Sequence, residues 1–224
     1  MNSNWNAPIN RVNGLYAITP DETDTAELLR KVRLALLGGA SVLQYRNKGA
    51  AQVRRLEQAT PRLEQAWALR ELTREFSVPL IINDDALLAQ QVGADGVHLG
   101  GADGSVAAAR ALLGSGRLIG VSCYNRLALA QDAVQQGADY VAFGSFFPSR
   151  VKPDARVAAP DLLRQARREI AVPLVAIGGI TAHNGAQLLE AGADALAVIS
   201  AVFGANDIQE AARQFSELDF SKTT

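Results

Sequence analysis

The sequence predicts an α/β protein with a single-domain (β/α)8 TIM barrel, and two observations carry this prediction. Short apolar segments alternate eight times with longer amphipathic segments rich in alanine and leucine. Polar and charged residues follow several of the apolar segments, at the strand end where such barrels place their active sites. A doubly wound parallel sheet would also satisfy the alternation, but eight repeats with polar strand ends favour the closed barrel.

The expected strands are short apolar runs, and the expected helices are the stretches in which apolar residues recur at helical spacing. The strands cover residues 15–19, 41–46, 79–83, 95–99, 117–121, 139–143, 172–177 and 194–199. The helices cover residues 25–37, 51–76, 85–92, 105–113, 126–136, 159–170, 182–191 and 206–216. Pro61 is expected to break or kink the second helix, because proline lacks the backbone N–H.

Gly-Ala pairs recur before four strands, where glycine suits the left-handed residue that ends a helix. The glycines are Gly39, Gly93, Gly137 and Gly192. Asp95, Asp139 and Asp194 follow three of these pairs. They lie at the face opposite the expected active site, so we assign them capping or turn roles and no chemistry.

Length and composition fit one barrel domain over residues 14–218, preceded by a polar, flexible tail over residues 1–13. The chain has 224 residues, of which 48% are hydrophobic, and 22 Lys and Arg nearly balance 23 Asp and Glu. This balance indicates neither a nucleic-acid nor a membrane partner. The single cysteine, Cys123, excludes an internal disulfide and fits a reducing compartment, the cytoplasm. The tail lacks the pattern of a signal peptide, and oligomeric state stays open.

Basic residues at the end of the second strand predict a phosphate or diphosphate site. Gln44, Arg46 and Lys48 fall at alternate positions, so in an extended chain they share one side. Such polar groups on a buried strand are costly unless they line a wet site. Arg and Lys together suit a phosphate group, although Lys48 alone could simply begin an exposed loop.

Acidic residues after the third and fourth strands predict a magnesium site. Asn83, Asp84 and Asp85 follow the third strand, and Asp103 follows the fourth. Carboxylates from adjacent strand ends can share one Mg²⁺, whose other ligands are waters and phosphate oxygens. A helix N-cap is the competing role for each acid. Of Asp84 and Asp85, one can cap a helix while the other binds metal.

The loops after the last three strands predict a second anion site. Residues 144–155 form a long loop, in which Ser149 and Lys152 could hold an oxyanion and Arg150 could be merely solvated. Gly178-Gly179 follows the seventh strand and Ile199-Ser200 the eighth. Loops at these positions form the recurrent phosphate site of such barrels.

No nucleophile with a general base is legible in the sequence. His98 lies within a buried strand pattern and is expected to be a hydrogen-bonded core residue, and His183 is expected on the surface. Cys123 is expected to pack beside the fifth strand, whose end places Ser122 as a ligand contact. Anion and metal binding without a nucleophile favours departure of a phosphate or pyrophosphate, or isomerisation of a phosphorylated sugar.

Together these segments resemble the thiamine-phosphate synthase family over nearly the whole chain. The resemblance is carried by LYAITP (15–20), QYRNK (44–48), IINDD (81–85), ADGVHLG (94–100), GVS (120–122), GADYVAFGSFFPS followed by Lys152 (137–152), VAIGGI (175–180) and VISAVF (198–203). It implies a transferase that joins a pyrimidine methyl diphosphate to a thiazole phosphate, releases pyrophosphate and forms thiamine monophosphate.

The resemblance also implies roles for residues and for Mg²⁺. The implied contacts to the pyrimidine diphosphate are Gln44, Tyr45, Arg46, Asn47, Lys48, Asn83, Ser122 and Lys152. The implied contacts to the thiazole phosphate are Ser149, Arg150, Val151, Gly179, Ile199 and Ser200. Arg46, Lys152 and Ser122 would be catalytic, and Asp84 and Asp103 would bind Mg²⁺. The family usually has a hydroxyl residue at the position of Val151, so one phosphate contact is missing here.

Two other functions are compatible with the sequence. The related thiazole tautomerase shares the barrel and the thiazole-phosphate site but performs a proton shift and needs no Mg²⁺–diphosphate site. The set of Arg46, Asn83, Asp84, Asp103 and Lys152 favours the synthase. A non-catalytic thiamine-phosphate-binding protein would use most of the same residues.

Overall fold

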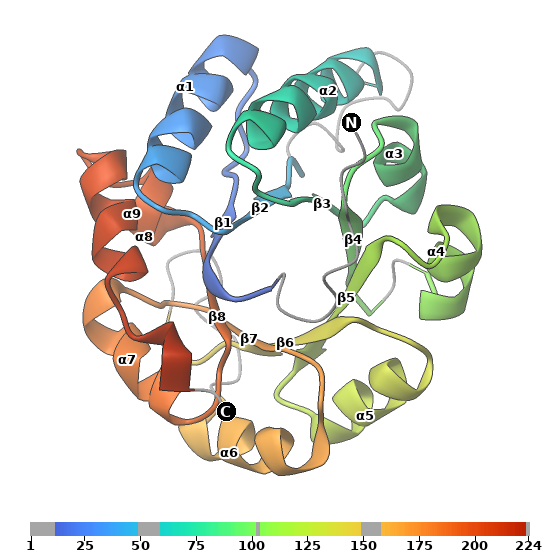
Figure 1. Ribbon diagram of the computed structural model, residues 1–224, viewed down its shortest axis with the longest axis vertical. Coiled ribbons are helices and arrows are strands. Elements are labelled where there is room, and N and C mark those ends of the chain that lie inside the picture. Colours follow the sequence, from blue (N-terminus) through green and yellow to red (C-terminus); the bar gives the residue numbers. More distant parts are fainter. Residues whose placement is uncertain (1–11, 49–58, 102–103, 149–157, 223–224) are drawn as a thin grey trace.

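Eight parallel strands close into a barrel, and helices surround it on the outside (Figure 1). The computed structural model describes residues 12–48, 59–101, 104–148 and 158–222. The strands are β1 (Gly14–Ile18), β2 (Val42–Tyr45), β3 (Leu80–Asn83), β4 (Gly96–Leu99), β5 (Leu118–Tyr124), β6 (Tyr140–Gly144), β7 (Leu174–Ile177) and β8 (Ala195–Val198). Each strand pairs with its sequence neighbours, and β8 closes the barrel against β1. The expected (β/α)8 fold is thereby confirmed.

The helices follow the expected order with two differences. They are α1 (Thr25–Leu37), α2 (Ala59–Glu75), α3 (Ala86–Gln91), α4 (Val106–Leu113), α5 (Leu127–Gln135), α6 (Pro160–Glu169), α7 (Ala182–Glu190), α8 (Ser200–Phe203) and α9 (Ile208–Ser216). The short helix α8 was not among the expected helices. Pro61 lies in the first turn of the described part of α2, where its missing N–H interrupts no described helical bond, so the expected break is absent there.

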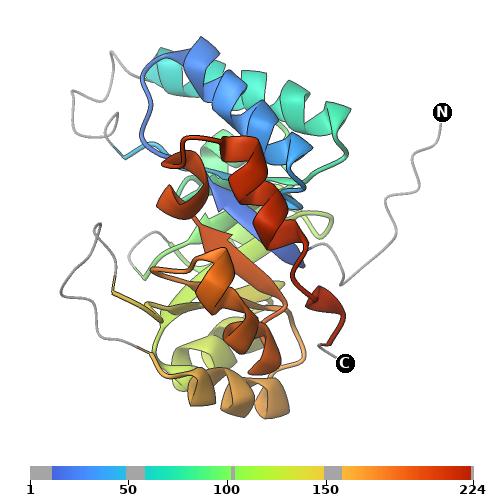
Figure 2. The same cartoon turned by 90° about the vertical axis from the view of Figure 1, so that its left-hand side faces the viewer.

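A short element closes the described part of the chain. It is a 3-10 turn (Phe220–Lys222) that follows α9, and Phe220 packs against the core. Figure 2 shows α9 along the side of the barrel between α1 and α7. Residues 1–11, most of the expected tail, lie outside the described ranges. None of the helices in those ranges combines the length and apolar character needed to cross a membrane.

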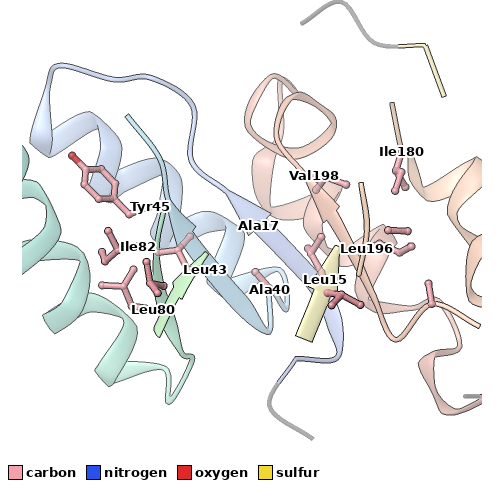
Figure 3. Packing of buried hydrophobic residues seen from close by; sticks show 14 of the residues in the cluster. Leu15, Ala17, Ala40, Leu43, Tyr45, Leu80, Ile82, Ile180, Leu196 and Val198 are labelled. Atoms are coloured by element: carbon pink, nitrogen blue, oxygen red, sulfur yellow. The ribbon is translucent and has the colours of Figure 1, made fainter. Parts of the chain in front are cut away.

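Alternation along the strands separates two hydrophobic clusters. Side chains on the outer face pack against the helices, as Leu43, Tyr45 and Ile82 do in Figure 3. The alternate positions point into the barrel, where Tyr16, Ile81 and Tyr140 are among the buried residues. This inner cluster fills the lower barrel and leaves polar residues at its C-terminal mouth.

The Gly-Ala pairs end helices as expected, since Gly39, Gly93, Gly137 and Gly192 all have positive φ angles. The three aspartates that follow lie at the opposite face from the mouth, but they do not cap helices. Each accepts a hydrogen bond from a backbone N–H of the preceding strand and pairs with an arginine of the helix before that strand. The sets are Asp95 with Leu80 and Arg70, Asp139 with Ile119 and Arg110, and Asp194 with Leu174 and Arg167.

Candidate active site at the C-terminal mouth of the barrel

The loop after β1 fixes the backbone of the predicted diphosphate-binding segment. Thr19 is fully buried, and its hydroxyl accepts a 2.9 Å hydrogen bond from the Arg46 N–H and donates one of 2.9 Å to the Arg46 carbonyl. The Asp21 carboxylate accepts a 2.7 Å bond from the Lys48 N–H and lies 3.3 Å from the Arg46 guanidinium. Arg46 and Lys48 are therefore held at the mouth by residues that the sequence prediction missed.

The side chains of Tyr45 and Asn47, the two neighbours of Arg46, bond to α2 and to the loop after β1, and a substrate contact from either residue stays a prediction. Tyr45 lies in the outer layer, where its hydroxyl donates a 2.7 Å bond to Gln65 of α2. Asn47 donates to the carbonyl of Glu22 at 3.0 Å and to Gln65 at 3.2 Å. Since adjacent side chains of a strand alternate in direction, the inward position of Gln44 forces Tyr45 outward.

The two acids after β3 have separate roles. Asp85 is the N-cap of α3, since its carboxylate accepts a 2.9 Å bond from the Leu88 N–H, and it also pairs with Arg62 at 3.0 Å. Asp84 has a left-handed backbone with φ of 63°, which is unusual for a residue with a side chain. Its carboxylate lies 3.1 Å from the Lys48 ammonium. Because Asp85 caps α3, Asp84 is the acid of this pair whose carboxylate can bind a ligand at the mouth.

A carboxylate in this position fits Mg²⁺, which binds through one or two carboxylates and keeps several waters. Asp84 is partly exposed and lies at a strand end beside the expected phosphate-binding residues. Within residues 12–48, 59–101, 104–148 and 158–222, no three His, Cys, Asp or Glu side chains form a metal-binding group. Asp103 lies outside those ranges, while Ser105 occupies the N-cap of α4.

A chain of hydrogen bonds crosses the barrel interior below the mouth. The Gln44 amide nitrogen donates a 2.8 Å bond to the Tyr16 hydroxyl, which lies 2.8 Å from the Tyr140 hydroxyl. Tyr140 lies 3.1 Å from His98 Nδ1, and His98 Nε2 lies 2.9 Å from Ser122 Oγ. Five strands contribute to this chain: β2, β1, β6, β4 and β5.

Burial keeps the middle of this chain uncharged. It raises the pKa of the Tyr16 and Tyr140 hydroxyls well above the usual value and lowers the pKa of His98 to about 4. His98 was expected as a hydrogen-bonded core residue, and the structure confirms this. His183 is exposed in α7, also as expected.

The Ser122–His98 contact has the spacing of a nucleophile and its base, but its surroundings argue against that chemistry. The second nitrogen of His98 faces a phenol rather than a carboxylate, and an imidazole with a pKa of about 4 is a weak base at neutral pH. Cys123 is buried and its pKa is raised to about 12, so it is inert, as expected.

The described residues of the predicted second anion site lie in the loops after β7 and β8. Gly179 has φ of 63°, and a Cβ atom there would lie 2.6 Å from the Pro148 carbonyl oxygen, so only glycine fits. Ile199 precedes the short helix α8, whose start has no capping side-chain bond, and Ser200 is exposed. These backbone groups resemble the recurrent phosphate site of such barrels.

The loop after β6 begins and ends beside this second site. Phe147 N–H donates a 3.0 Å bond to the Gly178 carbonyl, and Ala158 N–H donates a 2.7 Å bond to the Ser145 carbonyl. Ser149, Arg150, Val151 and Lys152, which the sequence predicts as ligand contacts, lie outside the described residues between these two anchors.

Comparisons with known proteins identify the family of this chain. The family described as thiamine monophosphate synthase matches residues 15–202. The chain belongs to this family. A thiamine-phosphate synthase of Methylobacillus flagellatus is 55% identical over 92% of this chain and 95% of its own length. One of Nitrosospira multiformis is 51% identical over 95% of this chain and 88% of its own.

A solved structure shares both the fold and the family. Thiamine phosphate pyrophosphorylase of Pyrococcus furiosus superposes with a TM-score of 0.78 at 35% identity, over 92% of this chain and 95% of that one. The recognition made from sequence motifs is thereby confirmed, and the two relatives named above are thiamine-phosphate synthases.

Proposed function

We propose that the protein condenses a pyrimidine methyl diphosphate with a thiazole phosphate at the barrel mouth, in a Mg²⁺-dependent reaction. The products are thiamine monophosphate and pyrophosphate. The observation that supports this site best is the grouping of Arg46, Lys48 and Asp84 on adjacent strand ends. It combines two cations suited to a diphosphate with one carboxylate suited to a metal.

In the first step, the bond between the pyrimidine methylene carbon and the diphosphate oxygen breaks, and its electron pair leaves with pyrophosphate. Arg46 and Lys48 would bind the departing group, and the Ser122 hydroxyl would donate a hydrogen bond to it. Such preorganised groups stabilise charge as it develops. Asp84 with Asp103 would hold Mg²⁺, which supplies further neutralisation of the phosphate charge. Lys152 is proposed to act on the same group.

In the second step, the lone pair of the thiazole nitrogen forms a bond to the methylene carbon of the pyrimidine cation. The residues around the second anion site, which include Gly179 and Ser200, would hold the thiazole phosphate and so orient the nitrogen. No side-chain nucleophile takes part. This agrees with the inert state of Cys123 and the weak basicity of His98.

The direct test is an assay with the purified protein, both substrates and Mg²⁺. Thiamine monophosphate and pyrophosphate should form in equal amounts, and mixtures that lack either substrate should give no thiamine monophosphate. Binding of both substrates without product would instead support a non-catalytic binding protein. We place the reaction in the cytoplasm, where the single buried cysteine would stay reduced.

A further inference from the structure

We infer that His98 is a positioning residue whose Nε2–H, fixed by a one-way chain of hydrogen bonds from Gln44, makes Ser122 a hydrogen-bond donor toward the bound diphosphate. This inference rests on the proposed function, because it concerns the Ser122 contact with the departing group. It adds a role for three residues, Tyr16, Tyr140 and His98, that lie beneath the mouth and carry no step of the reaction described above.

The direction of the hydrogen bonds follows from where each proton can go. The Gln44 amide nitrogen donates to the Tyr16 hydroxyl, and within the described part of the protein the only other partner of this buried hydroxyl is the Tyr140 hydroxyl, which therefore receives the Tyr16 proton. The Tyr140 hydroxyl then accepts from Tyr16 and donates its own proton to His98 Nδ1. A neutral imidazole carries one proton, so Nε2 carries it and donates to Ser122 Oγ.

The consequence lies at the mouth. Ser122 Oγ already accepts a hydrogen bond from below, so its own proton is available to an anion above it. If the chain ran in the opposite direction, Ser122 would donate down to His98 and would present only lone pairs to the diphosphate, which would be repulsive. The polarity of the buried chain therefore decides whether Ser122 attracts or repels the substrate.

The surroundings keep this polarity fixed. Gln44 is 3% exposed and His98 is 8% exposed, so little water reaches these groups to offer other partners. Gly120 leaves the space that the Tyr140 ring occupies, because a Cβ atom at this position would lie 1.9 Å from Tyr140 Cζ. The ring of His98 stacks on that of Tyr140 with centroids 5.6 Å apart, which holds the imidazole edge toward Ser122.

The first test reads the tautomer without reference to activity. The protein has two histidines, so a His183→Gln variant leaves His98 as the only imidazole for nitrogen-15 NMR. We expect a neutral ring with the proton on Nε2. A proton on Nδ1 would mean that the hydrogen bonds from Gln44 to Ser122 run in the opposite direction. An imidazolium would mean that the tautomer of His98 does not decide the hydrogen-bond direction at Ser122. Either result overturns the inference. His183→Gln itself should leave turnover unchanged.

The second test asks whether Tyr140 acts through Ser122, with single-turnover formation of thiamine monophosphate as the readout. Tyr140→Phe should slow the chemical step about tenfold, because it removes the donor that fixes Nδ1 as an acceptor. In a Ser122→Ala background the same change should have almost no further effect. Equal slowing in both backgrounds would show that Tyr140 acts elsewhere and would overturn the inference.

A pair of replacements at His98 provides a matched comparison. The amide nitrogen of glutamine reaches the place of Nε2, whereas that of asparagine reaches only the place of Nδ1. His98→Gln should therefore keep a larger share of the rate than His98→Asn, which should fall to the level of Ser122→Ala. The reverse order would contradict the proposed role. If the wild-type protein forms no product at all, the proposed function fails, while the NMR result still decides the polarity of the chain.

Discussion

The Lys48 ammonium lies 3.1 Å from the Asp84 carboxylate, so the predicted phosphate-binding cation and the predicted metal ligand face each other at the mouth. Both groups are partly exposed, with 56% of the Lys48 side chain and 25% of the Asp84 side chain accessible. An ion pair this exposed stabilises the fold by at most about 1 kcal/mol. It can therefore open readily when a diphosphate takes Lys48 and a metal takes Asp84.

Removal of the metal should abolish turnover, and Mg²⁺ should restore it. Asp84→Asn should lose most of the activity, because an amide oxygen is a weaker Mg²⁺ ligand than a carboxylate. Pyrophosphate release after EDTA treatment and Mg²⁺ addition measures both effects. Asp85→Asn is the matched control, since Asp85 caps α3 and asparagine caps helices equally well. Equal losses in the two variants, or full turnover in EDTA, would refute the assignment of Asp84.

Arg46 and Lys152 should matter most for the chemical step, because charge on the leaving group grows as its bond breaks. We expect Arg46→Gln and Lys152→Ala each to slow single-turnover product formation about 10²-fold or more. Arg30→Gln is a suitable control, since Arg30 is exposed on α1 and pairs with Glu27. Wild-type rates in the Lys152 variant would show that the loop after β6 does not act on the diphosphate.

Gly120→Ala adds a single methyl group and should disturb the hydrogen-bond chain that runs from Gln44 to Ser122. That Cβ atom would lie 1.9 Å from Tyr140 Cζ, and bonds to Tyr16 and His98 hold the ring in place. We expect about 1–3 kcal/mol of destabilisation in urea unfolding, together with slower turnover. Gly116→Ala, where no atom lies within 4 Å of the added Cβ, should change neither property. A fully active and stable Gly120→Ala variant would show that the ring has room to move.

The fold was readable from sequence because its signals are local. A Gly-Ala pair before a strand reports a left-handed helix end wherever the rest of the chain lies, and all four such glycines have positive φ. The sequence did not predict the four-residue helix α8, because it is too short to show helical periodicity. The capping alternative for Asp95, Asp139 and Asp194 was wrong, because the partners of these aspartates lie on a different strand and helix.

The site was only partly readable because its contacts are long-range. The sequence indicated that one of Asp84 and Asp85 would cap a helix, but only the start of α3 at Ala86 decides which. Alternation predicts that Gln44 points inward, yet it cannot say that Gln44 meets Tyr16, since this depends on the register across the barrel. The His98–Ser122 contact joins residues of two adjacent strands in the same way.

Arg70 and Asp95 form an ion pair at the face opposite the site, and its loss should affect stability rather than catalysis. Both side chains are 6% exposed, and their charged atoms lie 2.6 Å apart. Arg70→Met would leave the buried Asp95 carboxylate with only the more distant Arg117, 3.9 Å away, as a cation, and the loss of a buried partner destabilises a protein by up to about 3–5 kcal/mol. Arg164→Met removes an exposed pair with Asp161 and should change the free energy of unfolding by less than about 1 kcal/mol. Similar effects in urea unfolding would contradict the difference in burial.

Buried, neutral His98 should make the fold sensitive to mild acid. Burial lowers the pKa of His98 from 6.5 to about 4. Between these two pH values the unfolded chain therefore binds a proton that the folded chain does not. The free energy of unfolding should then be fully retained above pH 6.5 and should fall as pH decreases toward 4, by roughly 3 kcal/mol from this one group.

The contribution of His98 is obtained by comparison, because carboxylates also begin to titrate in this range. Urea unfolding at a series of pH values should give a steeper loss of stability for the wild type than for His98→Gln, whose side chain cannot take up a proton. The exposed His183 provides the control, and His183→Gln should follow the wild-type slope. If the wild-type and His98→Gln curves run parallel between pH 6.5 and 4, His98 can be protonated without unfolding, and the chain from Gln44 to Ser122 is less enclosed than its hydrogen bonds indicate.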